Sequence, residues 1–458
     1  MKNGKCFLRR LICVSLIFNF QFLIFIASAQ DTLCIDIDQC RQWALDYSQD
    51  IQRSANALKQ AELTKKSMLT HFFPQVEGSA MVLAIEDQHL IDREFVHLDL
   101  LMRGAYMCGF SLQQPLFAGG KIVNGYKLTK VGVEVAKEQQ RQQRAQILAD
   151  VESAYWTYVA VLSKERLIDE YYRNLDTLLR QVEGSVDVGM ATDYDLLQVK
   201  SAQSNLYYQR IRVQGGVTLC RLSLSRLVGI PADSVVLMPD TIIPDVTPPI
   251  LNADFPNRPE LRMLHYAVKA GDLMVKMKVA DYLPTLGIGL SYVWMGNVTM
   301  KGGLVFPRIG PFPIVPPYEI PLIDKTFNFH TPILAVSLSV PITRWWQGGY
   351  EIRKAKLEAQ NSRLEQEKNT ALLSLEVQQV IQNIEAGNAL INSSELALAA
   401  AEEMLRVAKN RYNANMTALS ELLDAQAKLR QAESDCIEAR TQYLIYLAEY
   451  RRVTGVVE

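Results

Sequence analysis

The sequence predicts an α+β membrane protein that consists of two tandem copies of one unit, each ordered helix, strand, strand, long helix, helix. Apolar residues recur every 3.5 positions from Ile147 to Val186, and the same spacing returns from Leu373 to Tyr412, 226 residues later. A narrow apolar stripe of this length is typical of supercoiled helices, and its recurrence in one register indicates an internal repeat. Ahead of each stripe the period changes to two, which indicates strands.

Residues 1–29 are predicted to be a secretory signal that is removed from the mature chain. Four basic residues precede the apolar run 11–26, and the small residues 27–29 provide a cleavage site before Gln30. The alternative is an N-terminal membrane anchor, but a spanning helix needs about 20 apolar residues. No later apolar run is longer, so the sequence predicts an exported protein without a transmembrane helix.

The charge balance and the motif content argue against two classes of function. Removal of the signal leaves 44 of the 48 basic residues against 49 acidic ones, a net charge of −5, whereas nucleic-acid binders usually carry a basic surplus. The five histidines are scattered, and the sequence has no nucleophile elbow, phosphate loop or cluster of His and Cys. We therefore expect neither an enzyme nor a site for a cofactor or metal.

Five cysteines remain after the signal: Cys34, Cys40, Cys108, Cys220 and Cys436. Cys34 and Cys40 are close enough in sequence to pair in an exported chain, but the total is odd and the other three are far apart. Cys220 and Cys436 fall on apolar helix seams, so burial as small apolar side chains is the favoured interpretation.

A helix that ends before a proline introduces the strands of each copy. The first is expected from Asp36 to about Phe72, and its counterpart begins at Glu260 and stops at Leu283, because a proline cannot continue a helix. Strands are then predicted at about 75–86 and 104–116 in the first copy and at about 285–296 and 331–342 in the second.

The predicted strands alternate apolar residues with small or polar ones. This alternation and a length near ten residues fit a membrane β-barrel, although a soluble sandwich gives the same pattern. Tyr292 and Trp294 lie near a strand end, where an interfacial aromatic girdle belongs, and this favours the membrane. Four strands cannot close a barrel, and an open sheet edge is not tolerated in lipid. The barrel must therefore be formed by the strands of several copies of the chain, either two or three.

The connections between paired strands, 86–103 and 298–329, are predicted to be the tips of hairpins. The second contains six prolines, which predicts a stiff loop without regular structure. His89 and His97 lie among acidic residues in the first loop, where a solvated polar loop is favoured over a metal site.

A long helical hairpin completes each copy. The first is predicted at about 120–229 with a break at Gly189, and the second at about 349–455 with a break at Asn415. The first copy thus covers 30–229 and the second 260–458. The linker 230–259 is rich in proline and has room for a short strand at 235–237, but not for a domain.

Several motifs stand at matching places in this order of elements. They are the helix ends Phe73-Pro74 and Leu283-Pro284, the segment Gln114-Pro115-Leu116-Phe117-Ala118-Gly119-Gly120, the turns Val188-Gly189-Met190 and Tyr412-Asn413-Ala414-Asn415, and Asn257-Arg258-Pro259-Glu260-Leu261. In this order, and over essentially the whole mature length, the chain resembles the TolC-like outer-membrane efflux proteins, or outer membrane factors.

The resemblance implies a homotrimer with a shared twelve-stranded β-barrel in the outer membrane of a Gram-negative bacterium, continued by an α-helical coiled-coil tunnel in the periplasm. Such a protein is the passive duct of a tripartite efflux or type I secretion system. The implied partners are copies of the chain, outer-membrane lipid, an inner-membrane pump and a periplasmic adaptor that docks on the closed end of the tunnel.

By position, the resemblance also implies roles for residues at the two hairpin turns. Asp195 and Tyr412 match residues of a hydrogen-bonded latch, and Thr417 stands where the best-studied pattern of the family has an arginine. Glu421 and Asp424 match acidic residues that line the constriction. The tip residues expected to dock the adaptor are Gly189, Met190, Asn415 and Met416.

The spacing of Glu421 and Asp424 places both carboxylates on one helical face. Three copies would gather six carboxylates around a narrow bore, which favours cations and should be blocked by multivalent ones. Plainer interpretations remain open, because both acids also fit a solvated surface and Tyr412 also fits packing on the seam. The alternative function is a periplasmic coiled-coil adaptor or scaffold without a pore.

Overall fold

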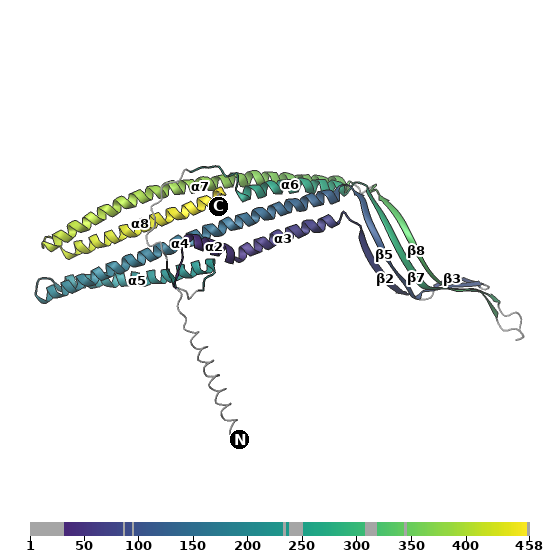
Figure 1. The fold of residues 1–458 in the computed structure, drawn as a ribbon, viewed down its shortest axis with the longest axis horizontal. Coiled ribbons are helices and arrows are strands. Elements are labelled where there is room, and N and C mark those ends of the chain that lie inside the picture. Colours follow the sequence, from purple (N-terminus) through teal and green to yellow (C-terminus); the bar gives the residue numbers. More distant parts are fainter. Residues whose placement is uncertain are drawn as a thin grey trace, which may run out of the picture. The chain divides into compact units, whose positions relative to one another are not determined.

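The computed structural model divides into two compact units that do not coincide with the two sequence copies. The helical unit takes residues within 1–56, 138–262 and 368–458, and the strand unit takes 57–137 and 263–367, so each draws on both copies (Figure 1). The predicted signal lies outside the described part of the chain. The structure describes residues 32–85, 88–93, 96–231, 235–237, 251–306, 318–342 and 346–455.

The two helical hairpins have matching bounds. Helix α4 (Lys121–Asp187) is followed by α5 (Asp193–Val228), and α7 (Gln347–Asn413) by α8 (Leu419–Thr454), so that each bound of the first hairpin recurs 226 residues later. The predicted breaks and ends are confirmed. The residues at these four places, Gly189, Gly229, Asn415 and Gly455, all take a positive φ, which ends a helix in the left-handed conformation. Across the described ranges, no helix combines the length and apolar character that a membrane span requires.

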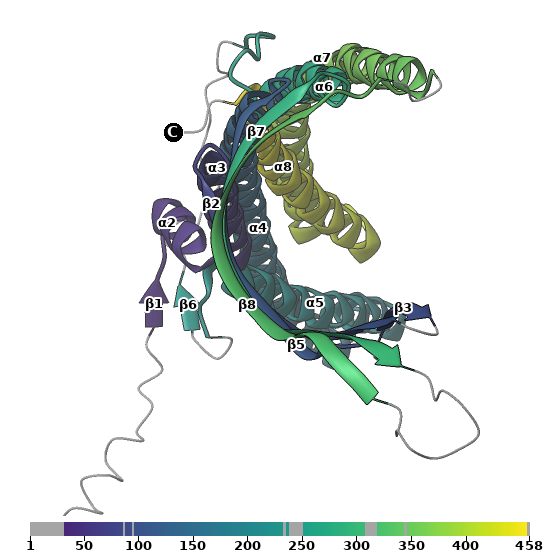
Figure 2. The same cartoon turned by 90° about the vertical axis from the view of Figure 1, so that its right-hand side faces the viewer.

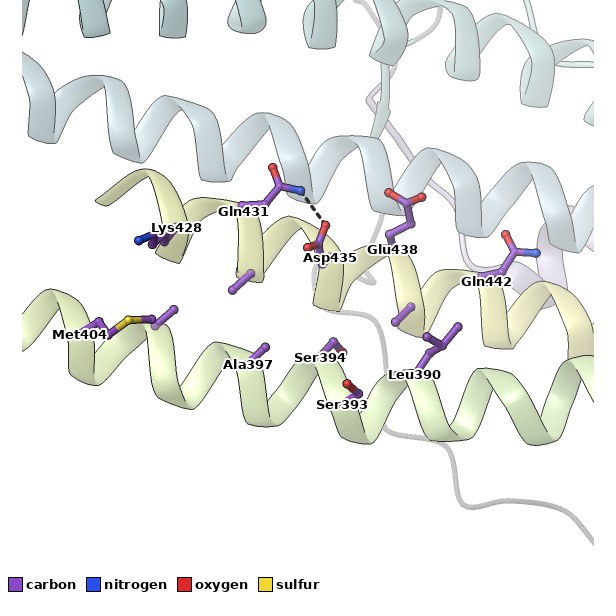
Figure 3. Close-up of a pocket in the computed structure, with 13 residues that line it drawn as sticks. Leu390, Ser393, Ser394, Ala397, Met404, Lys428, Gln431, Asp435, Glu438 and Gln442 are labelled. Carbon is purple, nitrogen blue, oxygen red and sulfur yellow. Dashed lines mark hydrogen bonds between the residues drawn. The ribbon is translucent and has the colours of Figure 1, made fainter. Parts of the chain in front are cut away.

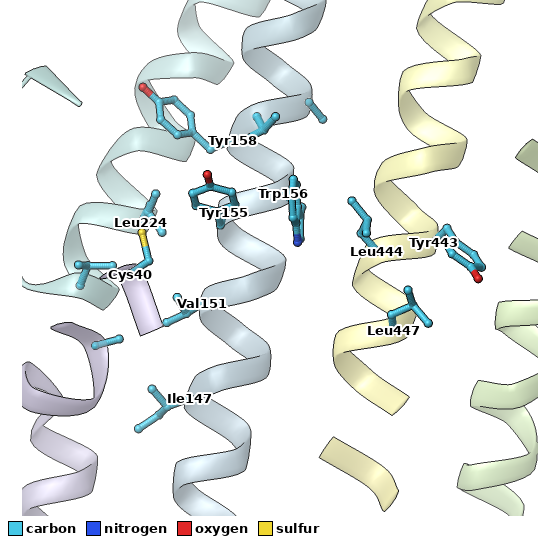
Figure 4. Close-up of a cluster of buried hydrophobic side chains, with 14 of the residues drawn as sticks. Cys40, Ile147, Val151, Tyr155, Trp156, Tyr158, Leu224, Tyr443, Leu444 and Leu447 are labelled. Atoms are coloured by element: carbon cyan, nitrogen blue, oxygen red, sulfur yellow. The ribbon is translucent and has the colours of Figure 1, made fainter. Parts of the chain in front are cut away.

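The seam predicted on the long helices forms the core of the helical unit. Val151 and Tyr158 on α4 are buried together with Val377 and Ile384 on α7. Figure 4 shows how side chains of α4, α5 and α8 gather in this cluster, with Cys40 contributed by the short helix α2 (Ile37–Tyr47). Burial of the same seam in both copies confirms the period of 3.5 read from the sequence.

The first helix differs from its prediction, because it is two helices rather than one. Helix α2 ends at Tyr47 and α3 (Gln49–Thr70) begins two residues later. Ser48 leaves the helical conformation with a ψ of 120°, and its Oγ accepts a bond from the Ile51 backbone N–H at 3.4 Å. A serine that caps the following helix competes with continuation of the preceding one. The prediction of one helix from Asp36 to about Phe72 was therefore wrong at Ser48.

Buried charges in the helical unit are paired. Glu152 is 5% exposed and accepts hydrogen bonds from Arg41 at 2.8 Å and Arg451 at 2.9 Å. Arg258 is 2% exposed and pairs with Glu260 and Glu376, and the latter also accepts from Arg452 at 2.6 Å. Burial pushes the pKa of Glu376 upward, but the two arginines outweigh burial and lower it.

The cysteines behave as small apolar residues. Cys40 and Cys436 are buried free thiols, and Cys108 and Cys220 are free and half-buried. Burial, together with the charge of Asp36, raises the pKa of Cys40 to about 12, so this thiol stays protonated at neutral pH. The side chain of Cys34 lies outside the described part.

Helix–proline junctions lead into the sheet as predicted. Helix α3 ends at Thr70, and α6 (Pro259–Ala280) ends before Pro284; strands start at Gln75 and Thr285. In the linker, the strand expected at 235–237 is present as β6 (Val235–Leu237), which pairs in parallel with β1 (Thr32–Cys34).

The strand unit is a curled antiparallel sheet (Figure 2). Strand β7 (Thr285–Phe306) pairs with β8 (Tyr318–Ser339) along most of its length. On its other side it pairs first with β5 (Arg103–Ala118) and then with β4 (Val96–Leu101). Strand β2 (Gln75–Ala84) pairs with β5, and β3 (Gln88–Arg93) pairs with β4. Near the helices the order is therefore β2-β5-β7-β8.

Two connections predicted as loops are largely strands. Residues 298–306 extend β7, residues 318–329 belong to β8, and β3 and β4 lie within 86–103. The prediction was wrong because prolines and charged residues also occur within strands of an irregular ladder. Pro321 lies beside a register shift of β8, where an irregular ladder tolerates proline. The predicted loop residues 86–87, 94–95 and 307–317 lie outside the described part.

Candidate functional site

The candidate site comprises the two turns that join the long helices, both in the helical unit. In the first turn, Gly189 has a φ of 74°. Its backbone N–H donates to Val186 O at 2.9 Å, and the Met190 N–H donates to Ser185 O at 2.7 Å. These bonds satisfy carbonyl groups at the end of α4 and turn the chain sharply, which is the role of a left-handed glycine after a helix.

Asp195 belongs to a capping box at the start of α5. The Asp195 N–H donates to Thr192 Oγ1 at 3.2 Å, while the Thr192 N–H donates to Asp195 Oδ2 at 3.0 Å. The Thr192 hydroxyl also donates to that carboxylate at 2.7 Å. A reciprocal pair of this kind satisfies free amides of the first turn. Asp195, which the resemblance places in a latch, is thus also a helix cap, and the Thr-x-x-Asp spacing in the sequence signals this cap.

The second turn has the same backbone form with a different residue. Asn415 has a φ of 57°; its N–H donates to Tyr412 O at 2.9 Å, and the Met416 N–H donates to Arg411 O at 2.9 Å. Asparagine is the commonest substitute for glycine in this conformation. Helix α8 then starts after Ala418, which offers no side-chain cap.

Glu421 is held by residues on the other side of this turn. Arg411 Nη1 lies 2.9 Å from Glu421 Oε1, and the Thr417 hydroxyl donates to Glu421 Oε2. Both members of the ion pair are about half exposed, so solvent limits its value to about 0–1 kcal/mol. The structure thus brings Thr417 and Glu421 together, whereas Arg411 was not among the sequence-predicted site residues.

Asp424 is also paired in the single chain. Lys428 Nζ lies 2.7 Å from Asp424 Oδ2, one turn along α8. This partner could have been found from the i, i+4 spacing of opposite charges; the pairing of Arg411 with Glu421 across a turn could not. The two acids project from one helix as predicted, but each has a basic neighbour.

Tyr412 packs partly buried against the apolar cluster at this end of the helices. The cluster joins Leu175 and Val182 of α4 with Leu419 and Leu422 of α8. Burial, and after it the negative charge of Asp195, raise the pKa of Tyr412. The two predicted latch residues therefore influence each other electrostatically, although no hydrogen bond joins their described side chains. Packing on the seam, the plainer interpretation, also fits this position.

Both turns carry exposed apolar side chains. Val188 and Met190 are 69% and 79% exposed, and Met416 is 71% exposed. Exposed methionines provide adaptable contact surface for a partner. Gly189 and Asn415 fix the backbone on which these side chains are presented.

A shallow groove lies between α7 and α8 away from the turns (Figure 3). Small residues such as Ser394, Ala397 and Ala401 of α7 face Ala432 and Ala439 of α8. Gln431 Nε2 donates to Asp435 Oδ1 at 2.7 Å on its rim. Small side chains from both helices explain the hollow.

Two histidines of the strand unit each lie beside a carboxylate. His89 Nδ1 lies 2.6 Å from Asp99 Oδ1, and His97 Nε2 lies 3.0 Å from Glu319 Oε1. Within the described part of the chain, no three potential ligands gather as a metal ion would need.

Comparison with known proteins shows the family. The family model described as outer membrane efflux protein matches residues 40–230 and 255–456, which is most of the chain. The chain belongs to this family. Its members are channels, so the protein is an outer-membrane duct for efflux or secretion with a helical part in the periplasm, and the scaffold alternative is not supported.

Individual relatives agree with this family. The alkaline protease secretion protein AprF of Pseudomonas aeruginosa is 22% identical over 363 residues, which cover 77% of this chain and 70% of that protein. Among solved structures, CusC matches with a TM-score of 0.74 and 15% identity over 93% of both chains. VceC of Vibrio cholerae matches with a TM-score of 0.71 and 15% identity over 92% of this chain and 96% of that one. At this identity, the structural matches establish the fold.

Proposed function

We propose that three copies of this chain form one barrel and one tunnel, which act as the exit duct for an inner-membrane pump. The observation that carries the proposal is the sheet of the strand unit. In a single chain, β2 lies at one edge of its membrane-facing part and β8 at the other, and neither has a partner on its outer side among the described strands. Lipid does not tolerate open edges, so β2 of one copy must pair with β8 of the next.

The faces of this sheet support a membrane location. Register places Leu286, Ile288 and Leu290 of β7 on one face with apolar residues of β5 and β8, apart from Gln114 opposite Ile288. The opposite face carries Gly287, Gly289 and Ser291, whose partners are mostly small or polar, with Ile333 opposite Ser291 as an exception. Apolar outside and polar inside is the pattern of a transmembrane barrel with a wet interior. We call these surfaces the apolar face and the polar face.

Aromatic residues mark both ends of the apolar face. At one end Tyr292 packs on Trp294, with ring centroids 4.4 Å apart, and on Phe110 at 6.0 Å. At the other end lies Phe117, opposite Leu286. From Leu286 to Trp294 the strand rises about 26 Å at roughly 3.3 Å per residue. That length fits an apolar band of about 25 Å flanked by aromatic girdles.

Three copies, rather than two, are supported by the likeness to the family. Four strands from each chain then give twelve, within the range of known barrels. The helical hairpins would continue the duct, and their exposed methionine tips would dock a periplasmic adaptor that links the duct to its pump.

Glu421 and Asp424 would line the narrow end of the tunnel. Arg411 and Lys428 lie beside these two acids in each copy. The cation selectivity of the constriction therefore depends on how far the side chains of Arg411 and Lys428 point away from the bore. If the negative charge of the acids exceeds the positive charge of these basic residues at the bore, the ring should favour cations and bind trivalent ions. The latch role of Asp195, Tyr412 and Thr417 belongs to the same proposal.

The test combines mass and conductance of the purified protein. Native mass spectrometry in detergent should give a trimer, and planar bilayers should show a cation-selective conductance that a trivalent cation blocks. The Glu421→Ala/Asp424→Ala variant should lose this block, while Glu402→Ala/Glu403→Ala, which removes the same charge from exposed positions of α7, should keep it.

Other results would reject parts of the proposal. Block that survives in Glu421→Ala/Asp424→Ala would remove the acidic ring. A trimer that stays silent as wild type and as Asp195→Ala/Tyr412→Phe would overturn the duct.

A further inference from the structure

The alternation of β7 reverses at a β-bulge just beyond the aromatic cluster. Met295 pairs with Phe329 and Val298 with Phe327, so β7 has one more residue than β8 in this interval. Asn297 occupies the bulge with a φ of 60°. Its N–H donates to Asn328 Oδ1 at 2.9 Å and its Nδ2 donates to Gly104 O at 3.0 Å. One extra residue moves every later side chain of the strand to the opposite face.

Beyond the bulge, the surface that continues the apolar face is charged. Lys301 of β7 stands between Asp99 of β4 and Asp324 of β8 in register, and His89 of β3 follows Asp99. The His89–Asp99 pair and the His97–Glu319 pair lie on this same side. A row of charges on the lipid side costs about 2–4 kcal/mol for each basic residue at the bilayer midplane, so this part of the sheet stands outside the hydrocarbon.

The surface that continues the polar face is mostly apolar. Gln88 and Lys325 lie at its base, next to the bulge, and Arg93 lies at its far edge, opposite Val96. The rungs beyond the base otherwise carry aliphatic side chains from all four strands. We call these side chains the inner patch: Ile91, Val96, Leu98, Leu304, Ile320 and Ile323. Ile91, Ile320 and Ile323 are 43%, 39% and 41% exposed in the single chain.

The strands are long enough to leave the membrane. Strand β7 has 22 residues, or about 70 Å at roughly 3.3 Å per residue. An apolar band of about 25 Å uses less than half of that length, even with a strand tilt of about 40°. The remainder is the stretch that pairs with β4 rather than β5.

We infer that residues 88–93, 96–101, 298–306 and 318–327 form a collar outside the outer membrane, in which the inner patches of neighbouring copies pack together and narrow the mouth of the duct. This inference rests on the proposed assembly of several copies. The inner patch continues the surface that faces the bore, so lipid cannot cover it. Rotational symmetry brings the same patch of each copy to the same axis. The inner patch of one copy is therefore covered by the inner patch of another copy.

A constriction lined with isoleucine and leucine closes by excluding water rather than by charge. The collar would thus be a second gate, distinct from the one proposed at the acidic turns. The two surfaces of the collar differ in function. The charged surface keeps the collar in water, and the inner patch narrows the pore.

Disulfide crosslinking between copies tests the inference. Ile323→Cys places a thiol on the inner patch, and Asp324→Cys places one on the charged surface one residue away. In protein verified as a trimer by native mass, a mild oxidant should link Ile323→Cys into covalent dimers and leave Asp324→Cys unlinked. On intact cells, a membrane-impermeant maleimide should label Asp324→Cys.

The alternatives give different results. Equal crosslinking of both variants, or none in Ile323→Cys, would overturn the collar while the trimer stands. An Ile323→Cys thiol that neither crosslinks nor reacts with maleimide would mean that another segment covers the patch, which also rejects the inference. Loss of the trimer in wild-type protein would instead reject the proposed function.

Conductance provides a second readout. Ile320→Ser/Ile323→Ser should raise the open-state conductance or open probability severalfold, whereas block by a trivalent cation at the turns should persist. Unchanged conductance in this variant would show that the inner patch does not narrow the pore.

Discussion

The two turns of the helical unit are copies of one another, yet they are held in different ways. Positions 189 and 415 both take the left-handed conformation, as Gly and Asn. After the first turn, Thr192 and Asp195 form a capping box within four residues. In the second copy the equivalent positions are Ala418 and Glu421, where the cap is absent and the carboxylate pairs with Arg411 across the turn.

The difference shows that two turns of the same backbone form can be stabilised by a local cap in one copy and by a longer-range contact in the other. Hydrogen bonds of a cap depend on backbone geometry and little on salt. An ion pair between half-exposed side chains is weak and is screened by salt. The second turn is therefore the one whose stability and charge respond to the surroundings, and it also carries the acids proposed to line the constriction.

Removal of the cap should have the largest effect on stability. Thr192→Ala should destabilise the first turn of α5 by about 1 kcal/mol, because backbone amides lose their acceptor. Hydrogen exchange of peptides covering 192–197 should then accelerate about fivefold, while those covering 418–423 stay unchanged.

The reverse change provides the matched control. Ala418→Thr would create Thr-x-x-Glu in the second turn, and exchange there should slow if the cap forms. If Thr192→Ala accelerates hydrogen exchange equally in both turns, the cap does not act only on the turn that contains it.

Neutralisation of Arg411 should have a small effect on stability and a clear one on conductance. Arg411→Gln loses an ion pair worth about 0.5 kcal/mol and leaves the charge of Glu421 uncompensated. Cation selectivity and affinity for a blocking trivalent ion should both rise, opposite in direction to Glu421→Ala. Arg406→Gln, which breaks the exposed pair with Glu403 on α7, is the control that removes the same charge away from the turn. Weaker block in Arg411→Gln would show that Arg411 itself binds at the bore.

The smallest expected effect concerns Tyr412, which links the second turn to Asp195 of the first. Its pKa is raised in the folded state by burial and then by the charge of Asp195. The unfolded chain therefore loses this proton at lower pH than the folded one. The associated stability is complete below the ordinary tyrosine pKa near 10 and is lost as pH rises through the higher folded value.

Thermal unfolding of wild type and Tyr412→Phe between pH 8 and about pH 11 isolates this contribution. The wild type should lose more stability than the variant above about pH 10, and Asp195→Asn should reduce the difference. Identical pH profiles of wild type and Tyr412→Phe would show that the pKa of Tyr412 is not raised in the folded state, and a difference unchanged by Asp195→Asn would show that Asp195 does not act on Tyr412.

Local patterns accounted for the helices and for most breaks between them. The period of 3.5, the positions of Gly189, Asn415, Gly229 and Gly455, and the alternation before each hairpin depend on residues close together in sequence. Such features are available without the fold because backbone geometry and side-chain period are local properties. The break at Ser48 was the exception. A serine within an otherwise helical pattern does not show whether it continues the helix or caps a new one.

The candidate site was predicted by position but not by partners. The sequence placed Glu421, Asp424 and Tyr412 at one end of the hairpins. It did not join Glu421 to Arg411, because these residues are ten positions apart and the chain has first to turn back through the left-handed Asn415. The resemblance had placed Asp195 and Tyr412 of the two copies in one hydrogen-bonded latch, whereas in the structure the charge of Asp195 acts on Tyr412 without a hydrogen bond between their described side chains.

The sequence by itself determined that the chain has two long helical hairpins, each preceded by strands with one apolar face, because hydrophobic period selects helix or strand and the face that is buried. Only the tertiary structure decided that β7 changes partner from β5 to β4 and that its alternation reverses at Asn297. Strand pairing is a contact between distant segments, and a single bulged residue, which no composition or period reveals, decides which face every later side chain takes.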